Sequence, residues 1–178
     1  MKIGLCGTMS VGKTTLVNAL KDDLNFKNYI FRTERSKHLN SMGIPLNTDS
    51  TLKGQLVFAA ERAAELMLPN IITDRTIIDV MAFCELSKSM SKAEKDHING
   101  VLWHLIREYD VIFHITDISI PIEDNGVRET DKEYRLEIHN KISSTLNMFG
   151  GMAGKVVKIS GTTKERINQV KSALAQYV

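Results

Sequence analysis

The sequence predicts a three-layer α/β domain, in which a five-stranded parallel sheet lies between two layers of helices. Short apolar runs suited to buried strands alternate with longer segments whose apolar residues recur at helical spacing. Residues 110–116, DVIFHIT, are almost continuously apolar, as a central strand of a parallel sheet is. No repeat or low-complexity linker interrupts the alternation, so we expect one domain over residues 1–178.

The first half of the chain contains three of the expected strands. Residues 2–6 and 28–33 are two of them, and the helix after the first has an apolar face of Leu16, Leu20 and Leu24. A loop precedes a helix over residues 48–67, whose apolar stripe is predicted to be Leu52, Leu56, Ala60, Ala63 and Met67. Pro69 ends this helix, and residues 70–73 form the third strand.

The second half supplies the other two strands, residues 110–116 and 155–160. Residues 76–90 are expected to be helical, and Ser91 and Glu94 have the spacing of a capping box at the start of the next helix. That helix has an apolar stripe of Ile98, Val101, Leu102, Leu105, Ile106 and Tyr109. Between the two strands, a polar segment leads into a helix that buries Tyr134, Ile138, Ile142, Leu146 and Phe149. A last helix follows residues 161–166.

A phosphate-binding motif lies between the first strand and its helix. Residues 7–14, GTMSVGKT, match the pattern Gly-x-x-x-x-Gly-Lys-Ser/Thr of a P-loop. Backbone N–H groups in such a loop face an anion at the helix N-terminus, Lys13 neutralises the β- and γ-phosphates, and the Thr14 hydroxyl can bind Mg²⁺. The motif predicts a P-loop NTPase fold with ATP and Mg²⁺ as cofactors, bound by Gly7, Ser10, Val11, Gly12, Lys13, Thr14 and Thr15.

Two carboxylates follow expected strands, at the sheet edge where ligands of open parallel sheets bind. Asp74 ends the third strand, and Glu34 follows the second. Phosphoryl transfer needs a group that holds Mg²⁺ and, for a hydroxyl acceptor, often a base. Asp74 is therefore a candidate metal ligand and Glu34 a candidate catalytic base. The alternative is that each carboxylate caps the helix that follows it.

Arginines form a second group of candidates. Arg75 adjoins Asp74, and Arg35 adjoins Glu34, so both are candidates for binding the acceptor. Arg128 and Arg135 belong to a polar segment at about residues 117–135, which we expect to be a helical lid that closes over ATP. If the lid is helical throughout, Arg128, Lys132 and Arg135 share a face. The alternative is a solvated charged face.

Composition excludes several other classes of protein. No apolar run approaches the length of a membrane span and no signal peptide precedes the first strand, so we expect a cytoplasmic protein without a membrane partner. Cys6 and Cys84 are expected to be buried, reduced thiols. The histidines have no metal-ligand spacing. The formal net charge of +2 gives little support to a nucleic-acid partner and does not exclude one.

With these motifs in place, the chain resembles P-loop kinases of the nucleoside and nucleotide group. The P-loop, TER after the second strand, DRTIIDVMAF after the third and DNGVRETDKEYR look most like the ATPases and kinases related to the ribosylnicotinamide kinase domain, which are similar to thymidylate kinase. The resemblance implies that Asp74 binds the metal and that Arg75 binds the acceptor. It also implies that Arg128 and Arg135 reach the transferring phosphate and that Gly161 and Thr162 contact adenine. The Asp-Arg-Tyr sequence usual in thymidylate kinases is Asp-Arg-Thr here, so the reaction class carries over better than the acceptor.

Three functions follow from the sequence. The first is transfer of the γ-phosphoryl group of ATP to a nucleoside or a (deoxy)nucleoside monophosphate, with that small molecule as the partner. The second is phosphorylation of a hydroxymethylated base within DNA, as by kinases of 5-hydroxymethyluracil DNA. The third is a regulatory ATPase without an acceptor, which would leave Glu34, Arg35 and Arg75 without a role. A homodimer is left open.

Overall fold

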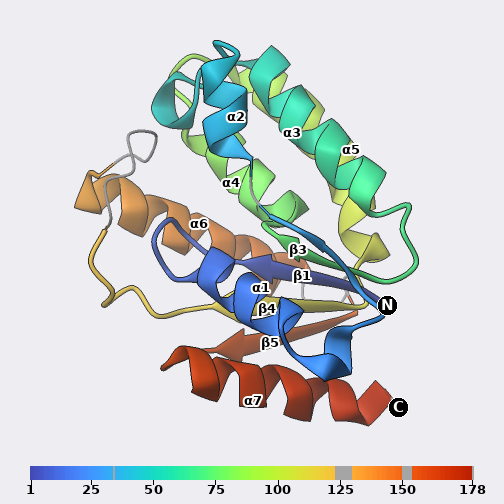
Figure 1. Cartoon of the computed structure of the whole chain (residues 1–178). Coiled ribbons are helices and arrows are strands. Elements are labelled where there is room, and N and C mark those ends of the chain that lie inside the picture. Colours follow the sequence, from blue (N-terminus) through green and yellow to red (C-terminus); the bar gives the residue numbers. More distant parts are fainter. Residues whose placement is uncertain (34, 123–129, 150–153, 178) are drawn as a thin grey trace.

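The computed structural model describes residues 1–33, 35–122, 130–149 and 154–177, and it confirms the expected α/β fold. A parallel sheet of five strands has the spatial order β2-β3-β1-β4-β5 (Figure 1). The strands are β1 (Lys2–Cys6), β2 (Ile30–Arg32), β3 (Ile71–Asp74), β4 (Val111–Ile115) and β5 (Lys155–Ile159). In register, Leu5 lies beside Asp74 and Cys6 beside His114, so three strands end at about the same level.

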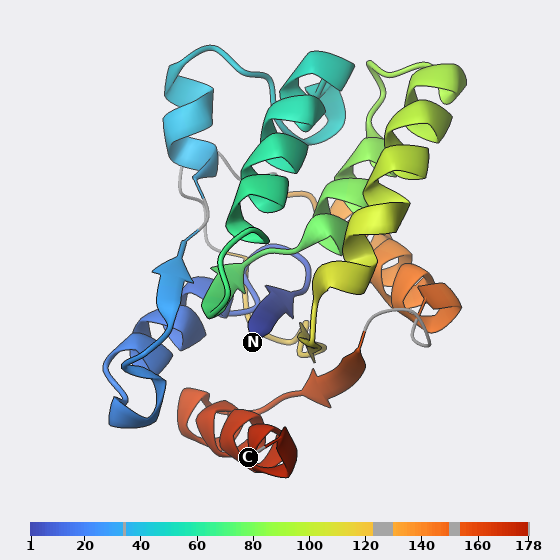
Figure 2. The same ribbon diagram turned by 90° about the vertical axis from the view of Figure 1, so that its right-hand side faces the viewer.

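Helices cover both faces of the sheet (Figure 2). Helices α1 (Lys13–Lys21) and α7 (Thr163–Leu174) pack on one face, against strand side chains that include Ile3, Leu5 and Phe113. Helices α4 (Ile77–Leu86) and α6 (Lys132–Phe149) cover the other face, and α3 (Leu52–Glu65) and α5 (Lys92–Leu105) pack against α4. Strand side chains alternate between the two layers, which gives the sheet two apolar cores.

The remaining elements are short. Helix α2 (Ser36–Ser41) lies in a region that we expected to be a loop, and the 3₁₀ turns are η1 (Leu24–Phe26), η2 (Asn47–Asp49), η3 (Ile106–Glu108) and η4 (Ala175–Tyr177). The strand expected at residues 28–33 is confirmed but shorter. None of the described helices is long and apolar enough to cross a membrane.

The predicted inward face of α6 is confirmed, because Tyr134, Ile138, Ile142, Leu146 and Phe149 are all buried. The predicted stripe of α3 is largely wrong, although Leu52 packs against the apolar core. Leu56 and Met67 are 48% and 83% exposed, and the face that is buried instead contains Gly54, Gln55, Ala59, Arg62 and Glu65. The reason is a polar contact, since Arg62 donates a hydrogen bond to the carbonyl oxygen of Asp74 and pairs with Glu65. Leu24 also lies outside its expected helix, because α1 ends at Lys21.

The start of α4 is fixed against β1. Thr76 caps the helix in a capping box with Asp79, and the Tyr109 hydroxyl accepts a hydrogen bond from the N–H of Ile77. Gly4 makes this approach possible, since a Cβ there would lie 2.4 Å from Thr76 Cγ2 and 2.9 Å from Tyr109 Cε1. The first turn of α4 therefore lies beside the loop that follows β1.

Candidate functional site

The loop between β1 and α1 has the backbone that its two glycines were expected to provide. Gly7 has φ 152° and Gly12 has φ 83°, backbone angles that residues other than glycine rarely adopt. A Cβ on Gly7 would also lie 2.9 Å from the carbonyl oxygen of Ile115. Ser10 has φ 56° without being a glycine, so the loop holds one residue in an uncommon conformation.

Lys13, the first residue of α1, bends back over this loop. Its ammonium group donates to the carbonyl oxygens of Gly7 at 2.6 Å and Thr8 at 2.7 Å, and its side chain is buried. Burial lowers the pKa of Lys13, and the positive charge of Arg75 lowers it further, although the acidic side chains nearby act in the opposite direction. Two cations therefore lie close together in this site, an arrangement that a bound anion would stabilise.

The hydroxyl of Thr14 donates a hydrogen bond of 2.5 Å to Asp74 Oδ2. Asp74 is fully buried, and its other carboxylate oxygen, Oδ1, has no hydrogen-bond partner among the described residues. A buried carboxylate oxygen without a donor, next to a threonine hydroxyl, fits a hard cation with oxygen ligands such as Mg²⁺. The alternative interpretation of Asp74 as a helix cap is wrong, because Thr76 is the cap of α4.

Two buried charged residues, which were not predicted from the sequence to belong to the site, hold the P-loop and Asp74 in place. Asp79 accepts hydrogen bonds from the N–H of Gly7 at 3.3 Å and from the N–H of Thr76 at 2.8 Å, so it ties the start of the loop to α4. Arg62 donates to the carbonyl oxygen of Asp74 at 3.1 Å. The sequence holds a signal for Asp79, because Thr76 and Asp79 have capping-box spacing, but none for Arg62.

The two candidate acceptor arginines lie in different surroundings. Arg75 follows β3 with φ 83°, and its guanidinium lies 4.9 Å from the ring centre of Phe83, a distance typical of a cation–π contact. Arg35 instead forms an ion pair with Glu61 at 3.0 Å, and half of its side chain is exposed. Arg75 lines the cavity beside the P-loop, whereas Arg35 is not among the residues that line it.

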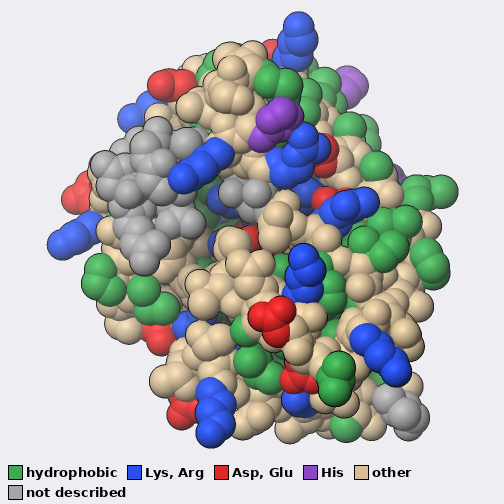
Figure 3. Space-filling view, in the orientation of Figure 1, with side chains coloured by type: hydrophobic (Ala, Val, Ile, Leu, Met, Phe, Trp, Pro, Cys, Tyr) green, Lys and Arg blue, Asp and Glu red, His purple; other side chains and the backbone are tan. Residues whose placement is uncertain are grey.

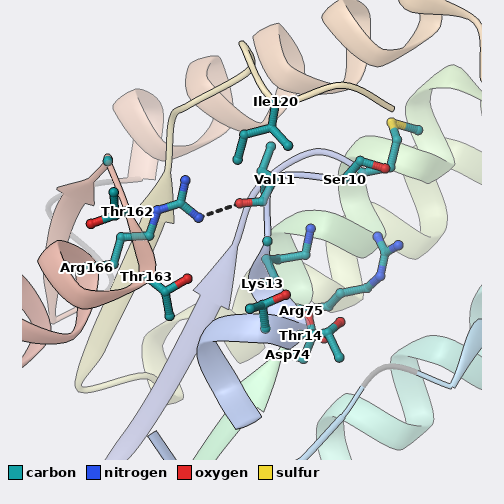
Figure 4. Close-up of a pocket in the computed structure, with 14 residues that line it drawn as sticks. Ser10, Val11, Lys13, Thr14, Asp74, Arg75, Ile120, Thr162, Thr163 and Arg166 are labelled. Carbon is teal, nitrogen blue, oxygen red and sulfur yellow. Dashed lines mark hydrogen bonds between the residues drawn. The ribbon is translucent and has the colours of Figure 1, made fainter. Parts of the chain in front are cut away.

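A cavity of about 270 Å³ contains most of the predicted cofactor residues. Figure 4 shows Lys13, Thr14, Asp74 and Arg75 on one side of Val11. Thr162, Thr163 and Arg166 lie on the other side, and Ile120 stands over the loop. Gly7 does not line the cavity, but its N–H donates to Asp79 and its carbonyl oxygen accepts from Lys13. The predicted residues that line the cavity are Ser10, Val11, Gly12, Lys13, Thr14, Thr15, Asp74, Arg75, Gly161 and Thr162.

The expected lid is described only in part. Glu34 and Arg128 lie outside the described residues. Arg135 is buried, donates to the carbonyl oxygen of Ile120 at 2.7 Å and is not among the residues that line the P-loop cavity. Helix α6 begins at Lys132, and Thr130 and Asp131 are not helical. The expectation of a lid that is helical throughout is therefore wrong, and with it the helical face that Arg128 and Arg135 were expected to share.

The histidines and cysteines have no catalytic arrangement in the part of the chain that the structure describes. No group of three or more His, Cys, Asp or Glu side chains there could hold a metal ion. Cys6 and Cys84 are free and buried, as expected. His114 of β4 is buried against His139 of α6, and burial lowers the pKa of His114 to about 4, with the neighbouring positive charges acting in the same direction.

A glycine-rich loop between a central parallel strand and a helix, with Lys13 and the Thr14–Asp74 pair beside it, defines a P-loop nucleotide-binding domain. A family model described as an AAA domain matches residues 2–166, and the chain belongs to this family. A search of curated protein sequences gave no significant match.

Solved structures confirm the resemblance in fold. A NadR protein in complex with NR matches over 99% of this chain, with a TM-score of 0.72 and 20% identity. A deoxyadenosine kinase from M. mycoides with bound dATP matches over 98% of this chain and 100% of its own, with a TM-score of 0.65 and 15% identity. The chain spans about half the length of the NadR structures, which it covers to 51% and 49%. At these identities the likeness concerns the fold.

Proposed function

We propose that the protein is an ATP-dependent phosphotransferase that moves the γ-phosphoryl group of ATP to a nucleoside or a (deoxy)nucleoside monophosphate. The observation that carries this proposal is the position of Arg75. Its cationic side chain lines the same cavity as Lys13, next to the Thr14–Asp74 pair. A nucleotide switch needs the loop and the metal ligands, whereas a second cation at the end of the neighbouring strand suits a second, phosphate-bearing substrate.

The residues of the cavity that the sequence singled out have proposed roles. Lys13 binds the β- and γ-phosphates, the backbone of residues 7–15 surrounds them, and Gly161 and Thr162 contact the adenine. Thr14 and Asp74 would hold Mg²⁺, which when bound neutralises the charge of the phosphates. Arg75 orients the acceptor.

The remaining candidates keep their proposed roles on the acceptor and lid sides. Glu34 is the proposed base for a hydroxyl acceptor, and Arg35 is proposed to assist in binding that acceptor. Arg128 is the proposed cation of the lid, and Arg135, which the sequence also suggested for this role, is proposed to act by holding the carbonyl oxygen of Ile120.

The likeness to known structures supports this class of reaction. The deoxyadenosine kinase structures contain dCMP, dCDP, dCTP or dATP, and the NadR structures contain NR or NAD with AMP-PNP. The surface lends less support to the DNA kinase. On the face shown in Figure 3, basic side chains are mixed with acidic ones over the described residues, whereas nonspecific DNA binding relies on clustered cations.

Production of ADP tests the proposal. It is measured with Mg·ATP alone, with a panel of nucleosides and monophosphates, and with DNA that contains normal or hydroxymethylated pyrimidines. We expect at least one small molecule to stimulate ADP production well above the rate without an acceptor. Stimulation by hydroxymethylated DNA alone would support the DNA kinase, and turnover that no acceptor stimulates would support the switch.

A further inference from the structure

We propose that Arg166 and Arg135 are positioning residues that tie the segment Asp117–Ile120 to both halves of the P-loop, so that nucleotide binding and the placement of this segment are coupled. The proposal rests on nucleotide binding at the P-loop, which is part of the proposed function. The two arginines come from α7 and α6, on opposite faces of the sheet.

Arg166 contacts the second half of the loop. The side chain lies in the first turns of α7, which the capping box of Thr162 and Glu165 fixes, and the residue is 3% exposed. Its Nη1 donates a hydrogen bond of 2.5 Å to the carbonyl oxygen of Val11 and lies 3.0 Å from where a Cβ on Gly12 would be. A guanidinium group buried to this extent is therefore packed directly on the loop.

The same guanidinium reaches the segment after β4. Its Nη2 lies 3.8 Å from Asp117 Oδ2, while Asp117 Oδ1 accepts hydrogen bonds from the N–H of Ser119 at 3.1 Å and from its hydroxyl at 2.6 Å. These hydrogen bonds from Ser119 lower the pKa of Asp117, so its carboxylate is ionised at neutral pH. One arginine thus bridges the loop and a charged side chain of the segment.

Arg135 makes the second connection, from the other side. Its Nη1 donates to the carbonyl oxygen of Ile120 at 2.7 Å, and its own carbonyl oxygen accepts a hydrogen bond of 3.0 Å from the hydroxyl of Thr8. Thr8 belongs to the first half of the P-loop. Ile120, which Arg135 holds at the end of the segment, lines the cavity, so the held segment forms part of the wall.

The contact to Val11 also sets the direction of a phosphate-binding group. In a trans peptide the C=O and the following N–H point in opposite directions. Because Arg166 holds the carbonyl of Val11, the N–H of Gly12 points away from Arg166, toward the side on which Figure 4 shows Lys13 and Arg75. Loss of Arg166 would free this peptide to rotate and weaken the binding of phosphate.

The test compares Arg166→Met with Lys171→Met, a matched variant on the same helix. Lys171 pairs with Asp23, which follows the C-terminal end of α1, whereas the P-loop precedes the N-terminal end of that helix. Two quantities are measured without an acceptor: the Kd for ATP, and the protection from hydrogen exchange that ATP gives to residues 116–122. We expect Arg166→Met to weaken ATP binding about tenfold or more, the range for a hydrogen bond to a charged group, and to abolish the protection. Lys171→Met should change the Kd less than about twofold.

A double-mutant cycle separates coupling from a merely structural role. Asp117→Asn should weaken ATP binding, and combining it with Arg166→Met should add less than about twofold, because both remove the same connection. Arg166→Lys keeps the charge and a single donor nitrogen, so it should retain part of the affinity. This variant and Asp117→Asn carry the test if Arg166→Met does not fold.

Three outcomes are distinguishable. Normal ATP affinity and normal protection in Arg166→Met, with only a lower Tm, would overturn the proposal and leave the proposed function intact. Additive effects of the two substitutions would also overturn it. Wild-type protein that does not bind ATP would contradict the proposed function itself and, with it, the coupling.

Discussion

Thr14 Oγ1 and Asp74 Oδ2 lie 2.5 Å apart, and this hydrogen bond joins the first turn of α1 to the carboxyl end of β3. The two residues are far apart in sequence and meet because β3 lies beside β1, with Asp74 in register with Leu5. Thr14 Oγ1 and Asp74 Oδ1, the carboxylate oxygen without a donor among the described residues, would act together as ligands of a cation.

Lys13→Ala should retain the fold and lose phosphoryl transfer. The ammonium group contacts loop carbonyl oxygens and lies in the cavity, apart from the two apolar cores. Charges of this kind are commonly worth about 10²-fold or more in rate. Circular dichroism should show an unchanged fold while ADP production falls, and full turnover at saturating Mg·ATP would refute the role of Lys13.

Asp74→Asn should fold and have strongly reduced turnover. The amide keeps the shape of the side chain and can still accept from Thr14, but it lacks the charge that Mg²⁺ requires. We expect a decrease in kcat of about 10²-fold. The control is Ser91→Ala, which removes the cap of α5 and should cost about 1 kcal/mol of stability with unchanged kcat. Near-normal kcat in Asp74→Asn would show that no metal depends on this carboxylate.

Arg75→Ala should raise the KM for the acceptor, with the Kd for ATP little changed, because the side chain is proposed to hold the second substrate. The expected increase is about tenfold or more, typical of a lost hydrogen bond to a charged group. Arg75→Lys is the matched control, since it keeps the charge but not the planar group over Phe83. If Arg75→Ala weakens ATP binding and leaves the acceptor KM unchanged, the residue belongs to the ATP side.

His114 should make the protein less stable in acid. Its pKa is lowered from 6.5 to about 4 by burial first, and then by His139, Lys158 and Lys13. Below pH 6.5 the unfolded chain binds a proton that the folded protein does not, so the free energy of unfolding falls as the pH falls toward 4. The contribution is about 2 to 3 kcal/mol between pH 7 and pH 4.5.

Urea unfolding at these two pH values measures this contribution. Between pH 7 and pH 4.5, the free energy of unfolding of His114→Leu should fall by about 2 to 3 kcal/mol less than that of the wild type. His97→Leu, at an exposed position of α5, should follow the wild-type pH dependence. Equal pH dependence in wild type and His114→Leu would show that His114 does not contribute.

The sequence predicts those parts of the molecule that local patterns determine. The glycine spacing of residues 7–14 gives the loop, and the strand and helix periodicities give the order of the elements, including the inward face of α6. The inward face of α3 could not be predicted, because Arg62 is buried by a contact to a backbone carbonyl of another element. The burial of Arg166 could not be predicted for the same reason, because its partner, Val11, is 155 positions away in the sequence. A charged residue near the start of a helix normally faces solvent.

The proposed function requires that the γ-phosphoryl group goes to an acceptor and not to water. The most direct measurement follows the label of γ-³²P-ATP in the presence of the best acceptor of the panel. We expect the label to appear in the phosphorylated acceptor, as a phosphate ester if the acceptor is a nucleoside and as a diphosphate if it is a monophosphate. The rate should fall together with ADP production in Lys13→Ala and Asp74→Asn. Label that appears only as inorganic phosphate, at a rate that no acceptor changes, would contradict it.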